Sequence, residues 1–183
     1  MTIQPFKNAI AQNVFLFVVF TVFLFSCKKE PEPLTLPPAT QTGENTFGCK
    51  VNGEVFVPNG NNLYPGISEP IINTEEDVFG FQCYNVKDYD CLTHVRVLVE
   101  NCFGVGTYPC TYYPTTYFVG CMAGYDAGFR LDTNYDNIVQ ITRFDSENRI
   151  VAGTFEYNLI DIEANEKISV TEGRFDVGDV LVY

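Results

Sequence analysis

We infer the fold class first from Thr46–Val57, which reads TFGCKVNGEVFV. Apolar and polar residues alternate on both sides of Asn52-Gly53, and a period of two is typical of strands. An Asn-Gly pair tolerates the positive φ angles that a two-residue type I′ turn requires. The stretch therefore predicts a hairpin in which Val51 faces Glu54. One set of side chains then shares the face toward the core: Phe47, Cys49, Val51 and Phe56.

Runs of similar character follow through the rest of the chain, separated by clusters of Asp, Asn and Gly. The runs cover residues 78–86, 92–100, 117–123, 127–131, 138–144, 150–162 and 167–177. No segment of useful length has the period of a helix. A chain of this length buries roughly two thirds of its unfolded surface. We therefore expect one all-β domain, a single antiparallel β-sandwich, with a small β-barrel as the alternative.

The last long run changes its alternation at Gly173. Ile168 and Val170 fall on one parity of the strand, whereas Phe175 and Val177 fall on the other. A β-bulge inserts an extra residue into one strand and so restores the face of the residues that follow. The sequence predicts such a bulge at Gly173, which would direct both pairs into the core.

The N-terminal residues have the pattern of an export signal. An apolar run from Val14 to Phe25 follows a single cation, Lys7, and ends in Ser26-Cys27. The run matches the length of a signal-peptide core and is shorter than the roughly 20 residues of a membrane-spanning helix. We interpret residues 1–26 as a lipoprotein signal peptide and Cys27 as the lipidated residue. A plain secretory signal is the alternative.

A proline-rich tether is expected at residues 27–44, ahead of the all-β domain at residues 45–183. Such a segment favours extended conformations of about 3.1 Å per residue, so it could hold the domain up to about 50 Å from its lipid. The acidic residues Glu30 and Glu32 resemble signals that carry lipoproteins to the cell surface. The sequence thus predicts an outer-membrane lipid anchor in the cell envelope, either surface-exposed or facing the periplasm.

The chain has seven cysteines, and lipidation of Cys27 leaves six. An even number of cysteines in an exported protein indicates disulfides. The candidates are Cys49, Cys83, Cys91, Cys102, Cys110 and Cys121. The pairing that their spacing suggests is Cys83–Cys91, Cys102–Cys110 and Cys49–Cys121, while the other connectivities stay open. No two of them have the short spacing of a zinc site, so no metal is predicted.

The formal net charge is −12 at pH 7. Nucleic-acid binding requires clustered Lys and Arg, and the chain has no such cluster after Lys28-Lys29. The composition therefore argues against a nucleic-acid partner.

One aromatic constellation could bind a ligand. Its tyrosines are Tyr108, Tyr112, Tyr113 and Tyr117, flanked by Pro109 and Pro114. Aromatic rings on stiffened loops can form a platform for a glycan or a peptide, although the same rings could equally fill the core.

The sequence has only weak matches to catalytic and metal-binding motifs. Asp132–Asp136 alternates oxygen ligands like a calcium loop, but Asn137 and Arg143 replace the Gly and Glu that such a loop needs. An Asp/Asn turn is the simpler interpretation. His94 is the single histidine and no nucleophile motif is present, so we predict neither an enzyme nor a cofactor.

Three segments together resemble a family of uncharacterised Bacteroidota lipoproteins. They are Thr46–Phe56, the run GTFEY at residues 153–157 and the run ISVTEGRFD at residues 168–176. The resemblance implies a lipobox, a short tether and one β-rich domain of unknown function, with no defined catalytic or binding residues. We therefore expect a membrane-anchored lipoprotein with a non-catalytic structural or interaction domain. A glycan- or peptide-binding module is the alternative.

Overall fold

The computed structural model of the chain describes residues 33–59, 66–68, 70–88, 91–110, 117–121, 129–161 and 165–183. Leu34–Tyr183 forms a compact unit. The described residues contain strands and turns but no helix, so the expected all-β class is confirmed. No segment of this described part is a helix that could span a membrane. The signal peptide and Cys27 lie outside the described residues.

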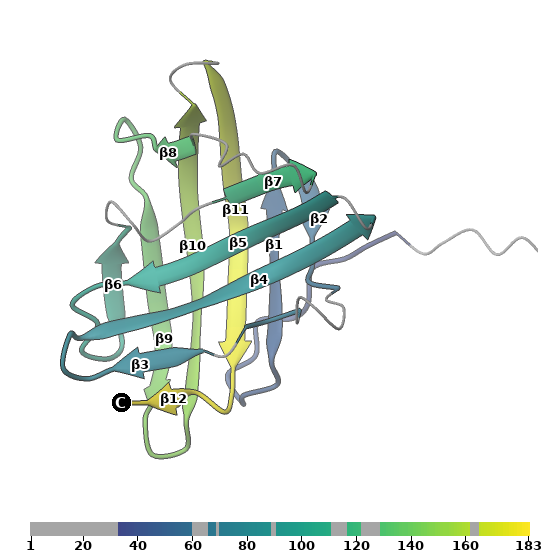
Figure 1. The fold of residues 1–183 in the computed structure, drawn as a ribbon. Helices are drawn as coiled ribbons and strands as arrows, with labels where there is room; N and C mark the ends of the chain where they lie inside the picture. Colours follow the sequence, from purple (N-terminus) through teal and green to yellow (C-terminus); the bar gives the residue numbers. More distant parts are fainter. Residues whose placement is uncertain are drawn as a thin grey trace, which may run out of the picture. The chain divides into compact units, whose positions relative to one another are not determined.

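The strands are β1 (Thr46–Val51), β2 (Glu54–Phe56), β3 (Ile71–Asn73), β4 (Val78–Asp88), β5 (Cys91–Val99), β6 (Gly106–Pro109), β7 (Tyr117–Cys121), β8 (Phe129–Leu131), β9 (Ile138–Asp145), β10 (Ile150–Asp161), β11 (Glu166–Val177) and β12 (Leu181–Val182). One sheet has the order β2-β1-β11-β10-β9-β6, with β8 also paired to β10, and the other has the order β12-β3-β4-β5-β7. Pairing is antiparallel except between β12 and β3. The second sheet lies across the first (Figure 1), and neither closes into a barrel, so the barrel alternative is wrong.

Aromatic side chains fill the space between the two sheets. The ring of Phe81 on β4 lies 5.9 Å from that of Phe47 on β1 and 5.2 Å from that of Phe175 on β11, between centroids. Phe155 on β10 stacks on Phe47 at 5.4 Å. Each such pair adds about 0.5–1.5 kcal/mol beyond the area that it buries. The sheets therefore share one core.

The predicted hairpin forms in the predicted register. Val51 pairs with Glu54 and Cys49 with Phe56. The turn residues Asn52 and Gly53 have φ angles of 50° and 87°, as a type I′ turn requires. The four side chains expected on the core face are all buried.

The predicted bulge also forms. Phe155 on β10 pairs with Gly173, but Tyr157 pairs with Val170, so Thr171 and Glu172 stand opposite a single β10 residue. Glu172 has a φ of 51°. The bulge leaves both apolar pairs buried, namely Ile168 with Val170 and Phe175 with Val177.

Residues 34–45, which we call the N-terminal strap, belong to the compact unit. The buried carboxylate of Asp176 on β11 accepts hydrogen bonds from the backbone N–H groups of Thr42 and Gly43, both at 2.8 Å. Pro37 lies over Gly48 of β1, so closely that a β-carbon there would be 2.5 Å from its ring. The sequence assigned residues 27–44 to a tether, and from Leu34 onward these residues contact the sheet.

The pairing suggested for Cys83 and Cys91 is wrong because of the strand register. Cys83 on β4 pairs with Val95 of β5, four residues from Cys91. Four residues of strand span about 13 Å, whereas a disulfide needs Cα atoms within about 7 Å.

The other suggested pairs lack the structure that they require. A single strand, β6, lies between Cys102 and Cys110 in place of a hairpin. Cys49 lies in the core, and Cys121 pairs with Cys91 at the edge of the other sheet. The side chains of Cys49, Cys83 and Cys102 are thiols. Burial raises the pKa of Cys49 to about 12, so this thiol is protonated at neutral pH.

Candidate ligand-binding groove

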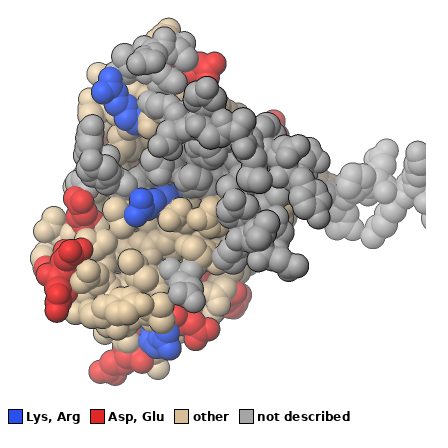
Figure 2. Space-filling model, in the orientation of Figure 1, with Lys and Arg blue, Asp and Glu red and all other residues tan. Residues whose placement is uncertain are grey.

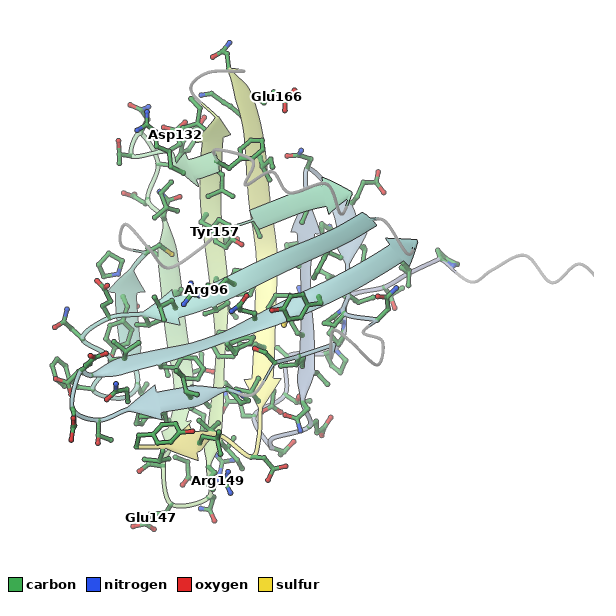
Figure 3. The ribbon with its side chains drawn as sticks, in the orientation of Figure 1. Arg96, Asp132, Glu147, Arg149, Tyr157 and Glu166 are labelled. Atoms are coloured by element: carbon green, nitrogen blue, oxygen red, sulfur yellow. The ribbon has the colours of Figure 1, made fainter. Side chains whose placement is uncertain are left out.

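A groove of about 780 Å³ lies at the end of the molecule where β8 turns into β9. In Figure 3 this is the end that carries the labels Asp132 and Glu166. Side chains from the turn and from the neighbouring strands line it: Pro109, Cys110, Arg130, Leu131, Asp132, Thr133, Asn134, Tyr135, Asp136, Asn137, Ile138 and Ile160. The groove therefore combines apolar, aromatic and charged groups, as ligand sites do.

Asp132 organises the turn. Only 2% of its surface is exposed, and its Oδ1 accepts hydrogen bonds from the backbone N–H and the Nδ2 of Asn134, at 3.1 and 2.6 Å. Its Oδ2 accepts one from Lys167 Nζ at 3.2 Å. The backbone bond from Asn134, the side-chain bonds and the Lys167 charge hold the pKa of Asp132 below its usual value despite burial. The carboxylate is thus ionised and fully engaged at neutral pH.

Asn137 closes the other side of the turn. Its Nδ2 donates to the carbonyl oxygens of Asp132 at 3.0 Å and Tyr135 at 3.2 Å. Its Oδ1 accepts from the backbone N–H of Asn158 on β10 at 2.7 Å. The turn is therefore fixed to the sheet before any ligand binds, which reduces the entropy lost on binding.

Tyr135 is the aromatic group that this rigid turn presents. It is 49% exposed. Lys167 Nζ lies 5.7 Å from the centre of its ring, within the range of a cation–π interaction. An exposed ring held in this way offers a flat apolar surface, and the exposed Asp136 and Arg130 beside it offer hydrogen-bonding groups.

The turn interpretation of Asp132–Asp136 agrees with this geometry. An ammonium group, that of Lys167, sits on the Asp132 carboxylate that would be the first ligand of a calcium loop. The turn is an Asx turn, in which the side chain of Asp132 accepts from the backbone two residues later.

The predicted tyrosine platform is described only in part. Tyr108 on β6 is half-buried, packs against the core and donates from its hydroxyl to the carbonyl of Gly104 at 2.8 Å. Tyr117 pairs with Val95 in the backbone register, and its side chain lies outside the described part. Tyr112 and Tyr113 lie outside the described residues.

The structure brings the described start of the tyrosine-rich segment, residues 108–110, next to the Asp/Asn turn. The backbone N–H of Cys110 donates to the carbonyl of Asn137 at 2.8 Å, and both Pro109 and Cys110 line the groove. Sequence reasoning treated the two features separately and missed Tyr135 as an exposed ring. The contact of this ring with Lys167, which lies 32 positions away along the chain, could not be read from a local pattern.

A second groove, of about 880 Å³, lies at the opposite end of the molecule, where Figure 3 labels Arg149. The N-terminal strap forms one wall of it. The guanidinium of Arg149 already donates to the carbonyl oxygens of Val180 and Asp179, at 2.7 and 2.9 Å. The guanidinium group at this groove is therefore already engaged.

On the face drawn in Figure 2, the described Lys and Arg side chains stand apart from one another, while Asp and Glu gather along the lower rim. The basic stripe that would bind a phosphate backbone is not seen among the described residues of this face. Comparison with known proteins found no match to a family model, to a curated protein or to a solved structure.

Proposed function

We propose that this chain is a bacterial outer-membrane lipoprotein, anchored by lipid on Cys27, whose β-sandwich is a non-catalytic interaction module. The signal pattern of residues 1–27 and the resemblance to Bacteroidota lipoproteins support the anchor. The sandwich is stabilised by its shared aromatic core.

The groove at residues 130–138 supports glycan binding as the activity of this module. The observation that carries the proposal is the exposed Tyr135 ring on a turn already fixed by Asp132 and Asn137. An aromatic ring provides a large apolar face at little conformational cost, and sugars present apolar C–H faces with hydroxyl groups at their edges. Asp136 and Arg130 lie where such hydroxyls could bond. A peptide is the alternative ligand.

The engagement of the Asp132 carboxylate supports the non-catalytic part of the proposal. A general acid or base needs a pKa near the working pH. The Asp132 pKa is lowered, and both of its oxygens already accept hydrogen bonds, so it is suited to holding the turn and not to moving protons.

A glycan array followed by calorimetry on the full-length protein in detergent micelles tests the binding proposal. We expect saturable binding that Tyr135→Ala weakens by about tenfold or more, equivalent to ~1.4 kcal/mol. Tyr183→Ala is the matched control, because Tyr183 is a 67% exposed tyrosine at the other end of the molecule (Figure 1). Equal loss in both variants, or binding to peptides but to no glycan, would refute glycan recognition by this groove.

Metabolic labelling with a fatty-acid analogue tests the anchor. The wild-type protein should take up the label and fractionate with the outer membrane. Cys27→Ala should remain unlabelled, and label retained by that variant would rule out lipidation at Cys27.

A further inference from the structure

Two cysteines are directly opposed in the backbone register of neighbouring strands of the smaller sheet. Cys91, the first residue of β5, pairs with Cys121, the last residue of β7. The next pairs, Leu92 with Gly120 and Thr93 with Val119, continue without a shift of register. We propose that Cys91 and Cys121 form a disulfide that ties the edge strand β7 to β5.

The backbone geometry of an antiparallel pair suits this bond. Directly opposed residues have Cα atoms about 4.5 or 5.5 Å apart, depending on the type of pair. Natural disulfides bridge Cα atoms about 4.4–6.8 Å apart, so either type of pair falls within the range. Opposed residues also lie on the same face of the sheet. The bond therefore needs no movement of the strands.

The bond would act at an edge of the sheet. In the described part of the chain β7 is an edge strand of five residues that pairs with β5 alone, so β5 is the strand that holds it. An edge strand leaves backbone N–H and C=O groups unpaired on its outer side. The segment between Cys110 and Tyr117 leads from β6 in one sheet to β7 in the other. A bridge at Cys121 would hold β7, the strand that follows this segment, on β5.

The reaction is a two-electron oxidation, and it rests on the proposed export of the chain. The thiolate of one cysteine attacks a disulfide oxidant, either glutathione disulfide or a thiol–disulfide oxidoreductase of the cell envelope, and releases one thiol. The second cysteine then displaces the other half of the oxidant. The protein loses two electrons and two protons, and the oxidant gains them as two thiols.

Peptide mapping of the wild-type protein tests the bond directly. The full-length protein in detergent is equilibrated with a glutathione redox buffer, alkylated without reduction and digested with trypsin. Trypsin separates Cys91 from the peptide that carries Cys102, Cys110 and Cys121 by cleaving at Arg96, and chymotrypsin then divides that peptide at Phe103, Tyr112 and Tyr117. We expect Cys91 and Cys121 in one linked peptide that reduction releases. Alkylated Cys91 and Cys121, or Cys91 linked to another cysteine, would overturn the proposal.

Two variants test which cysteine is the partner of Cys91. Cys121→Ser should leave Cys91 open to alkylation, whereas Cys102→Ser should leave the linked peptide intact. The same mapping on protein taken directly from cells tests the proposed export independently of the cysteine pairing. A bond that forms in the redox buffer but is absent in cells would count against export, and a bond absent from both would count against the pairing.

Discussion

Gly173 has no room for a side chain, because the backbone and the ring of Phe155 lie directly against it. A β-carbon at this position would lie 2.5 Å from the backbone oxygen of Phe155 and 2.6 Å from its ring. Neither backbone nor buried ring can yield by that much without disturbing the β10–β11 pairing. Overpacking of this kind costs about 1–3 kcal/mol. We expect Gly173→Ala to lower the free energy of unfolding by that amount in urea denaturation.

Gly106→Ala is the control for this prediction. Gly106 lies on the edge strand β6 without a positive φ, and a β-carbon there would meet only the side chain of Tyr108, at 3.3 Å, a contact that a shift of a few tenths of an ångström relieves. Its free energy of unfolding should stay within about 0.5 kcal/mol of the wild type. Equal losses in the two variants would show that the Phe155 contact is not what makes Gly173 necessary.

At the scale of elements, the N-terminal strap depends on one buried carboxylate. Burial by itself would raise the pKa of Asp176, but hydrogen bonds from the backbone N–H groups of Thr42 and Gly43 outweigh it and lower the pKa. Bonds to a charged group contribute about 1.5–3 kcal/mol each. Asp176→Asn removes the charge at nearly constant volume. We therefore expect faster hydrogen exchange at the amides of residues 42–44, measured by NMR.

Asp136→Asn provides the comparison for the strap. Asp136 is an exposed carboxylate of the turn between β8 and β9, which lies at the groove and away from residues 42–44, so its substitution should leave their exchange unchanged. Unaltered protection of these amides in Asp176→Asn would mean that the apolar contact of Pro37 with Gly48 holds the strap, and not the carboxylate.

Some features of these elements could be predicted from the sequence, and others could not. The hairpin at Asn52-Gly53 and the bulge at Gly173 were predictable, because a period of two and a turn pair are local signals. The pairing of the cysteines was not predictable, because it depends on which residues of β4 and β5 are opposed and on the pairing of β7 with β5. The contacts of the strap were not predictable for a related reason. Its proline-rich composition does not reveal that Asp176, more than 130 positions away, accepts hydrogen bonds from its backbone. The Asp/Asn turn of the groove was predictable, but the Lys167 contact that makes Tyr135 a candidate was not.

At the scale of the whole molecule, the lowered carboxylate pKa values determine the response to acid. Hydrogen bonds from Arg143 and Asn148 lower the pKa of Asp145 from 3.8 to about 2, and the pKa values of Asp132 and Asp176 are also lowered. A group whose pKa is lower in the folded state binds protons more readily when unfolded. Its contribution to stability is therefore complete above about pH 5 and is lost as the pH falls through the folded value.

We expect the free energy of unfolding in urea to fall steadily as the pH drops from about 4 to about 2. The net charge passes through zero near pH 4.3, so below that pH the growing excess of positive charge repels itself and adds to this loss. Added salt separates the two effects, since it screens the exposed charges and leaves the buried hydrogen bonds of Asp176 largely intact. The decline should therefore persist at high salt and become shallower in Asp176→Asn. A stability that stays level between pH 4 and 2 at high salt would show that these carboxylates are bonded no better in the folded protein than in water.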